Sequence, residues 1–344
     1  MSLFSRIKNL VDSKQSLPKS ANDTQNAHQQ QNTDTPPIKS TYEQIAEDKD
    51  KLSAPTEFTQ EQIALFNKLQ SQLQEVVLKT HHAFIRINTQ VCETMRLTDS
   101  KFGGVPYIPA NGFYPKAADG TPLMLLAQIN FEQVFEQVSH NEFAQLPKQG
   151  LLQIFINAGE EDLGKDEDER TPNSNYQVHF IPSIDITATP LSESTKMARQ
   201  SVDDNYLEEV FSPISTPLKL SFIKEYGCAG VSENLLEFIA ANQGQAIDEL
   251  DYENGEKEDI AYEAINKLSN ASGHKLLGMP VFPNEEIRKP YSTQKLFLQI
   301  DSEYPMTESY EIMWGDMGVA NFFIQPDALL NKDFSNLIYN WDSE

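Results

Sequence analysis

The chain has 344 residues, of which 27 are lysine or arginine and 51 are aspartate or glutamate, giving a formal net charge of −24. A surface this acidic repels phosphate backbones, so we do not expect nucleic acid as a partner of the folded part. The charge either favours a basic protein or cation or serves only solubility. The two cysteines, Cys92 and Cys228, are too few for a disulfide framework. The sequence contains no secretory leader and no run of about 18 apolar residues, so we expect a cytoplasmic protein without a transmembrane segment.

The first 58 residues contain seven basic and eight acidic side chains, so nearly all of the net charge lies on the rest of the chain. Residues 1–14 predict a short amphipathic helix with apolar and basic faces. Such a helix could dock weakly on a membrane or a partner, fray, or pack within the chain, and the sequence leaves these alternatives open. Residues 15–57 are polar, amide-rich and interrupted by proline, which predicts a flexible linker.

The folded part is expected to span residues 58–344 and to begin with a helix over 60–79. Thr59 and Gln62 form a capping-box pattern directly before apolar residues at helical spacing. The following segment, 83–97, loses this period and is compatible with a strand or an extended loop.

A six-residue pattern occurs twice, as KFGGVP at 101–106 and KLLGMP at 275–280. Three apolar segments follow each copy in the same order: LLAQIN at 125–130, GLLQIFIN at 150–157 and YQVHFIP at 176–182, then LFLQID at 296–301, GVANFFIQ at 318–325 and LIYNWD at 337–342. A predicted helix precedes each series, at 60–79 and 258–268. We therefore expect an α+β fold with mixed or mostly antiparallel sheet, built by internal duplication from two helix-plus-strands units at about 60–190 and 258–344.

The repeated pattern K-x-x-G-x-P predicts a rigid turn, since glycine permits unusual backbone angles and proline fixes one. Its members are Lys101, Gly104 and Pro106 in the first copy and Lys275, Gly278 and Pro280 in the second. A polar residue, Gln128 or Gln299, lies at the same place in each first apolar run. Each glutamine either pins a neighbouring loop or strand edge, or contacts a ligand in a cleft between the two halves.

Several longer motifs occur together in one order: FGGVPYIP at 102–109, DGTPLMLLAQIN at 119–130, LPKQGLLQIFI at 146–156, HKLLGMPVF at 274–282, and WGDMGVANFFI at 314–324 followed by DFSNLIYNWD at 333–342. With these motifs, residues 60–344 resemble the YwqG family of uncharacterised bacterial proteins. The resemblance implies an α+β fold and no established activity, substrate or cofactor. Members of that family are sometimes found with bacterial toxin and immunity systems.

No pattern of residues predicts a metal or cofactor site. The acidic stretches at 160–170 and 248–259 lack the spacing of a calcium loop, and the six histidines include no zinc-binding pair. Asp316 lies in the turn WGDMG beside Trp314, where it either faces a cleft or hydrogen-bonds its own backbone.

The sequence therefore predicts a non-catalytic intracellular protein-interaction module with an acidic surface, for which neutralisation of a toxin is one form of the role. The alternative is a hydrolase or small-ligand-binding protein that uses a cleft between the two repeats, with Gln128, Gln299 and Asp316 as its polar groups. No cofactor is expected in either case.

Overall fold

The computed structural model describes two compact units of the chain. The described residues are 53–68, 70, 82–110, 112–159, 161–166, 172–173, 175–185, 212–227, 260, 264, 267, 269–283, 287, 293–305 and 310–343. One unit comprises Met1–His82 with Tyr226–Ala271, and the other comprises Ala83–Glu225 with Ser272–Glu344. The helix predicted at 1–14, most of the linker predicted at 15–57, and Cys228 lie outside the described residues.

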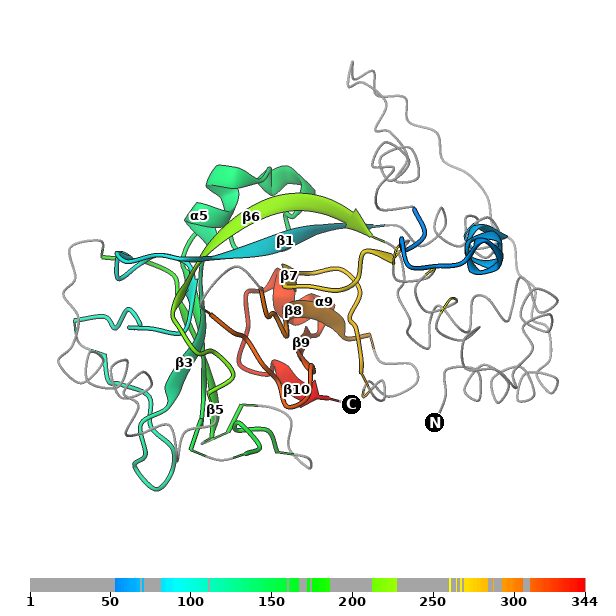
Figure 1. Cartoon of the computed structure of the whole chain (residues 1–344). Helices are drawn as coiled ribbons and strands as arrows, with labels where there is room; N and C mark the ends of the chain where they lie inside the picture. The colour runs from blue at the N-terminus through cyan, green and yellow to red at the C-terminus, as the bar shows by residue number, and fades with distance from the viewer. Residues whose placement is uncertain are drawn as a thin grey trace, which may run out of the picture. The chain divides into compact units, whose positions relative to one another are not determined.

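The second unit is built on a single ten-stranded sheet (Figure 1). The strand order is β10-β9-β8-β7-β1-β6-β2-β3-β4-β5. The strands are β1 (His82–Val91), β2 (Lys101–Phe102), β3 (Met124–Asn130), β4 (Leu151–Ile156), β5 (Tyr176–Ile181), β6 (Leu218–Gly227), β7 (Lys275–Leu276), β8 (Lys295–Asp301), β9 (Val319–Ile324) and β10 (Ile338–Asp342). Three short helices accompany them: α5 (Phe131–Gln137), η2 (His140–Glu142) and α9 (Pro326–Leu330). Every strand pair whose register is described is antiparallel.

The prediction of an α+β fold made of two helix-plus-strands units is wrong. In the described part of the sheet unit the regular secondary structure is mainly strand, whereas the helical residues 60–68 and 260, 264, 267 and 269 belong to the other unit. The local predictions were better. The six apolar segments that follow the repeated pattern are all strands. The capping box is present too, because the Thr59 backbone N–H donates to Gln62 Oε1 (2.7 Å) and the Gln62 N–H donates to Thr59 Oγ1 (3.3 Å).

The two series of strands share the same register within the one sheet. Each copy of the pattern begins a two-residue strand, in which Lys101 pairs with Gln128 and Lys275 pairs with Gln299. The next strand in each series has an irregularity two residues before its glutamine, between Leu125 and Ala127 or between Leu296 and Leu298. The similarity of KFGGVP and KLLGMP therefore reflects equal strand registers in the two series. It does not extend to the helices predicted before each series.

One face of the sheet, here called the inner face, packs into a single apolar core that both series of strands share. Side chains from the two ends of the sheet contact each other in this core, since the ring centroids of Tyr176 on β5 and Tyr339 on β10 lie 4.9 Å apart, although the two strands do not pair. In the first half, the opposite face, here called the outer face, is covered by the loop that follows the repeated pattern, because Ala117 and Leu123 from this loop pack on Leu125 and Phe155.

The β4–β5 loop is also hydrogen-bonded to β10. Trp341 Nε1 donates to the carbonyl of Asp162 (2.8 Å), and Tyr339 Oη donates to the carbonyl of Leu163 (3.3 Å). In return, Lys165 Nζ donates to the Trp341 carbonyl (3.2 Å) and lies 5.1 Å from the centroid of its ring. The described residues 161–166 of this loop are thus held against β10, because side chains of β10 donate to the loop and a side chain of the loop donates to β10.

Gly318, directly before β9, lies where the backbones of β9 and β10 approach closely, so a substitution there tests how much this contact contributes to stability. A Cβ at this position would lie 2.2 Å from the Asp342 carbonyl oxygen and 2.5 Å from that of Trp314. We expect Gly318→Ala to lower the free energy of unfolding by about 3 kcal/mol, because backbone atoms must move. Gly159→Ala is the control, since its nearest atom is a side-chain oxygen at 3.3 Å. Urea denaturation of both variants measures the difference, and equal stabilities would contradict the prediction.

Candidate functional site

A row of polar side chains crosses the outer face of the first half. Lys101, Gln128, Gln153 and His179 are successive register partners on β2, β3, β4 and β5. The first three are at most 2% exposed, although the flanking residues of each strand are apolar and enter the core. We call this set row 1.

The second half carries an equivalent set, row 2, on β7, β8, β9 and β10. Lys275, Gln299, Asn321 and Asn340 are again successive register partners, and all four are buried. Two strands, β1 and β6, lie between β7 and β2. The lysines and glutamines singled out in the sequence therefore form two separate groups and do not converge on one site.

In row 1, the Gln128 amide holds the repeated turn from both sides. Its Oε1 accepts from the N–H of Tyr107, the residue after Pro106 (2.9 Å), and its Nε2 donates to the carbonyl of Asp99 (2.8 Å). Gln153 completes the arrangement, because its Nε2 donates to the Tyr107 carbonyl (2.6 Å) and to Gln128 Oε1 (2.8 Å). The chain before and after the turn is thereby pinned to the sheet.

Row 2 repeats these contacts at the corresponding positions. Gln299 Oε1 accepts from the N–H of Val281, the residue after Pro280 (2.9 Å), and Gln299 Nε2 donates to the Gly273 carbonyl (2.9 Å). Asn321 Nδ2 donates to the Val281 carbonyl (2.7 Å). Of the two roles that the sequence left open for the glutamines, pinning of a neighbouring loop accounts for both atoms of each amide.

The turn itself has the backbone geometry that the pattern predicted. Gly104 and Gly278 have φ angles of 76° and 88°, and the residues before them, Gly103 and Leu277, are also left-handed at 66° and 65°. Leucine rarely adopts such angles, so the second copy is the more strained of the two. Both prolines of the pattern are buried.

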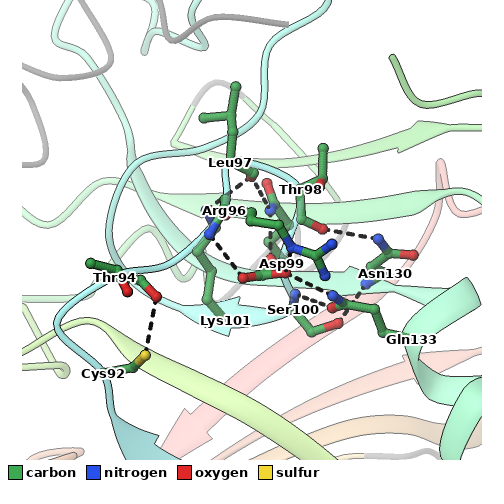
Figure 2. Close-up of polar contacts among 11 residues, drawn as sticks. Cys92, Thr94, Arg96, Leu97, Thr98, Asp99, Ser100, Lys101, Asn130 and Gln133 are labelled. Carbon is green, nitrogen blue, oxygen red and sulfur yellow. Dashed lines mark hydrogen bonds and ion pairs between the residues drawn. The ribbon is translucent and has the colours of Figure 1, made fainter. Parts of the chain in front are cut away.

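Lys101 is buried next to its own incoming loop (Figure 2). Its Nζ donates to the carbonyls of Leu97 (3.0 Å) and Arg96 (3.4 Å). Burial lowers the pKa of Lys101 to about 8, against the opposing effect of the Asp99 charge.

Asp99 is the anion of this cluster, and its side chain is 3% exposed. Burial acts to raise the pKa of Asp99, but hydrogen bonds from Gln133 and Arg96 outweigh burial and bring it below the ordinary value. Gln133 Nε2 and Arg96 Nε donate to Asp99 Oδ1 at 2.8 and 2.9 Å, while the Arg96 N–H donates to Oδ2 at 2.8 Å. Figure 2 shows these groups gathered around the loop that precedes Lys101.

Lys275 lies in a more heavily charged setting on row 2. Burial holds its pKa well below the ordinary value and the Arg86 charge lowers it further, whereas Asp301 and Glu225 act in the opposite direction. Arg86 Nε donates to Glu225 Oε2 at 3.1 Å, and Lys275 Nζ lies 5.7 Å from the ring centroid of Phe84. Asp301 in turn accepts from the Gly273 N–H (2.6 Å), so these charges are engaged within the fold.

A second polar cluster, centred on Glu303, was not anticipated from the sequence. Its carboxylate accepts from His274 Nε2 (3.0 Å), Thr89 Oγ1 (2.7 Å) and Tyr310 Oη (3.0 Å). Burial acts to raise the pKa of Glu303, but these hydrogen bonds lower it overall, with His274 contributing most. The Asp301 N–H donates to His274 Nδ1 (3.0 Å), which assigns the Nε2 proton to the contact with Glu303.

Trp314 and Asp316 lie on opposite sides of the turn before β9. Trp314 is fully buried in the core, and the Gly318 N–H donates to its carbonyl (2.8 Å). Asp316 and Met317 are exposed at the tip of this turn, where Met317 has a φ of 56°. The indole and the carboxylate therefore do not face a common site.

Among the described residues, more acidic than basic side chains are exposed. The acidic ones include Glu132, Glu136 and Glu142 on and after α5, Glu161, Asp162 and Asp166 in the β4–β5 loop, and Asp185, Asp316 and Asp327. The exposed basic residues are Lys68, Arg96, Lys116, Lys148, Lys295 and Lys332. Among the described residues, no group of three or more histidine, cysteine, aspartate or glutamate side chains could hold a metal ion.

Sequence reasoning missed several members of these clusters. Gln153 and Asn321 could have been found, because each is a polar residue inside an otherwise apolar strand at an equal distance from the start of its motif. The Glu303 cluster gave no such signal, since its members come from four separate segments.

The pinning role of the glutamines predicts a loss of stability when an amide is removed. Gln128→Ala leaves buried backbone groups of Tyr107 and Asp99 without partners, so we expect the free energy of unfolding to fall by about 3 kcal/mol. Gln299→Ala should behave alike. Gln90→Ala, at an exposed position of β1, is the control and should change it by less than about 0.5 kcal/mol. Urea denaturation provides the measurement, and a Gln128→Ala variant as stable as the control would refute the pinning role.

The lowered pKa of Lys101 predicts a pH dependence of stability. Between about 8, its value in the folded chain, and 10.5, the unfolded chain holds the proton more often, so raising the pH favours folding. The difference in unfolding free energy between the wild type and Lys101→Met should therefore grow in favour of the wild type, by up to about 1.4 kcal/mol per pH unit. Denaturation at pH 7, 8, 9 and 10 measures this difference, and a flat profile would contradict the prediction.

Comparison with known proteins places this sheet in a family. No curated protein matches the chain. None of the helices in the described segments is long and apolar enough to cross a membrane. A family model described as a domain of unknown function (DUF1963) matches residues 100–343, which include both rows and every strand except β1. Because this match covers well over half of the sequence, the chain belongs to the DUF1963 family of domains of unknown function.

Proposed function

We propose that this chain is a non-catalytic protein-interaction module that presents an acidic surface to a basic protein partner. The observation that carries the proposal is the imbalance of exposed charge on the sheet unit. Among its described residues, twelve acidic side chains are exposed against five basic ones, and other basic side chains lie wholly or partly inside the fold.

Four basic residues illustrate the inward placement. Lys101 and Lys275 are at most 2% exposed, Arg86 is paired with Glu225, and Lys165 is held against β10. Each cation withdrawn from the surface leaves the acidic side chains there less neutralised. A field of one sign speeds encounter with an oppositely charged partner and disfavours partners of like charge.

The acidic segment 161–166 of the β4–β5 loop supports the same role because its position is fixed. Its backbone is fixed because the Asp162 and Leu163 carbonyls accept from the side chains of Trp341 and Tyr339. Glu161, Asp162 and Asp166 are exposed on this fixed backbone. A surface that is already ordered loses less conformational entropy on binding.

Neutralisation of a basic toxin is the form of this role that the resemblance to the YwqG family favours, by association alone. A hydrolase or small-ligand role for a cleft between the repeats stays an alternative. It has less support, because Gln128 and Gln299 use both amide atoms on backbone groups. The cytoplasmic location stays a prediction.

The proposal is tested with the full chain as bait in a cytosolic extract of the native organism, washed at about 50 and 300 mM salt. We expect a basic protein that is retained at low salt and released at high salt. After its identification by mass, calorimetry with the purified partner should show at least a tenfold weaker Kd in the amide variant Glu161→Gln/Asp162→Asn/Asp166→Asn. The control variant, Glu132→Gln/Glu136→Gln/Asp327→Asn, removes the same charge elsewhere. A partner that is not basic, or a Kd insensitive to both salt and either variant, would refute the proposal.

A further inference from the structure

β5 forms one edge of the ten-stranded sheet. It pairs with β4 alone, through six consecutive register pairs from Leu151↔Ile181 to Ile156↔Tyr176, with no bulge between them. One side of the β5 backbone is therefore regular, extended and directed away from the sheet.

The alternation of an antiparallel ladder identifies which residues of β5 direct their backbone groups outward. The Asn157 N–H donates to the Asn175 carbonyl (2.8 Å), one step beyond the Ile156↔Tyr176 pair. Residues 177, 179 and 181 then face β4, like residue 175, whereas 176, 178 and 180 face the free edge. Consistent with this assignment, the Tyr176 carbonyl accepts from the N–H of Asn173 (2.8 Å).

The outward backbone groups of Val178 and Phe180 are thus left at the edge. No hydrogen bond of these groups occurs in the described part of the chain. Both side chains point to the inner face and pack against the core, so the edge is held in place by the interior. The result is a fixed template of two N–H and two C=O groups.

β5 also lacks the features that usually protect an edge strand. Natural edges carry lysine, proline, a bulge or an inward-pointing charge that prevents another strand from adding. The β5 segment, YQVHFI, has none of these. Burial lowers the pKa of His179, which disfavours a charged imidazole at this edge.

The opposite edge of the sheet, β10, is obstructed by comparison. Lys165 Nζ donates to the outward Trp341 carbonyl (3.2 Å), and the strand ends in a charged residue, Asp342. Of the two edge strands, β5 alone therefore offers a regular row of outward backbone groups in the described part of the chain.

Charge at both ends of β5 indicates what could occupy the edge. Glu161, Asp162 and Asp166 are exposed in the loop that leads into β5, and Asp185 is exposed just after it. A second copy of this chain would bring the same negative charges against them. An extended segment with basic residues at both ends would instead be attracted at each end.

We propose that the basic partner adds an extended segment to the free edge of β5, with its backbone bonded to Val178 and Phe180 and its basic ends near the acidic residues that flank the strand. The inference rests on the proposed function and names the docking edge for it. Main-chain hydrogen bonds then supply affinity, and alternate side chains of the segment supply specificity, as in other cases of strand addition.

Amide hydrogen exchange on the full chain tests the edge without any mutation. In the free chain, the Val178 and Phe180 amides should exchange fast and the Gln177 and His179 amides slowly. The probe is the synthetic peptide KKTVTVTKK, and its equally charged counterpart KKTPTPTKK cannot supply the same backbone donors. We expect the first peptide to slow exchange at Val178 and Phe180 at least tenfold, and the second to leave it unchanged.

The other outcomes separate the two proposals. If both peptides bind with similar, salt-sensitive affinity and neither slows exchange at β5, strand addition is overturned while the acidic binding surface stands. If neither peptide binds, both proposals lose support.

A matched pair of variants tests the same point with the captured partner. Val178→Pro removes an outward N–H without touching the bonds to β4, so the strand should stay in place and binding should weaken at least tenfold. Val178→Ala keeps the N–H and loses a comparable amount of side-chain packing, and should bind like the wild type. Circular dichroism checks that both variants fold. Equal binding by the two variants would overturn the inference, whatever the amide variants of the acidic loop show.

Discussion

Side-chain amides that hydrogen-bond the backbone on both sides of a turn are the constraint on which this sheet depends. β2 and β7 are only two residues long, so their own ladder bonds cannot hold the chain on the sheet. Gln128 and Gln299 add bonds to segments before and after each turn, and they do so from inside apolar strands. A buried amide is costly unless both ends are satisfied, which makes the position of the turn specific as well as stable.

Burial of polar side chains also affects the electrostatics of the chain. Lys101 has a pKa of about 8 and so keeps most of its charge at pH 7, next to Asp99 and two carbonyls. A positive charge beneath a surface rich in carboxylates moderates the self-repulsion that a net charge of −24 creates. The buried basic side chains thus moderate the repulsion between the exposed carboxylates from within. The carboxylates themselves stay on the surface, where the basic side chains of a partner can contact them.

Much of the sheet could be predicted from the sequence, because the relevant signals are local. Continuous apolar runs such as LLQIFI predict strands buried on both faces, and Thr59 with Gln62 predicts a helix start. The fold class could not be predicted in the same way, since periodicity shows that a helix is amphipathic and not which unit it packs in. β6 has the alternating pattern of a half-buried strand, as in LKLSFI at 218–223, but it was missed because it has no repeated counterpart in the other half. At the candidate site, equal spacing identified Gln128 and Gln299, whereas the cluster around Glu303 depends on contacts between distant segments.

The junction between the β4–β5 loop and β10 also has a consequence for how the chain is made. Leu163 and Tyr339, which it joins, are separated by 176 residues. At about 5–20 residues per second, roughly 9–35 s pass between the synthesis of one and the arrival of the other. During that interval Tyr176 and its neighbours lack the aromatic residues of β9 and β10 that cover them in the finished fold. The first half of the sheet thus spends that time on the ribosome with part of its apolar face open, a period in which chaperone binding or mispairing competes with folding.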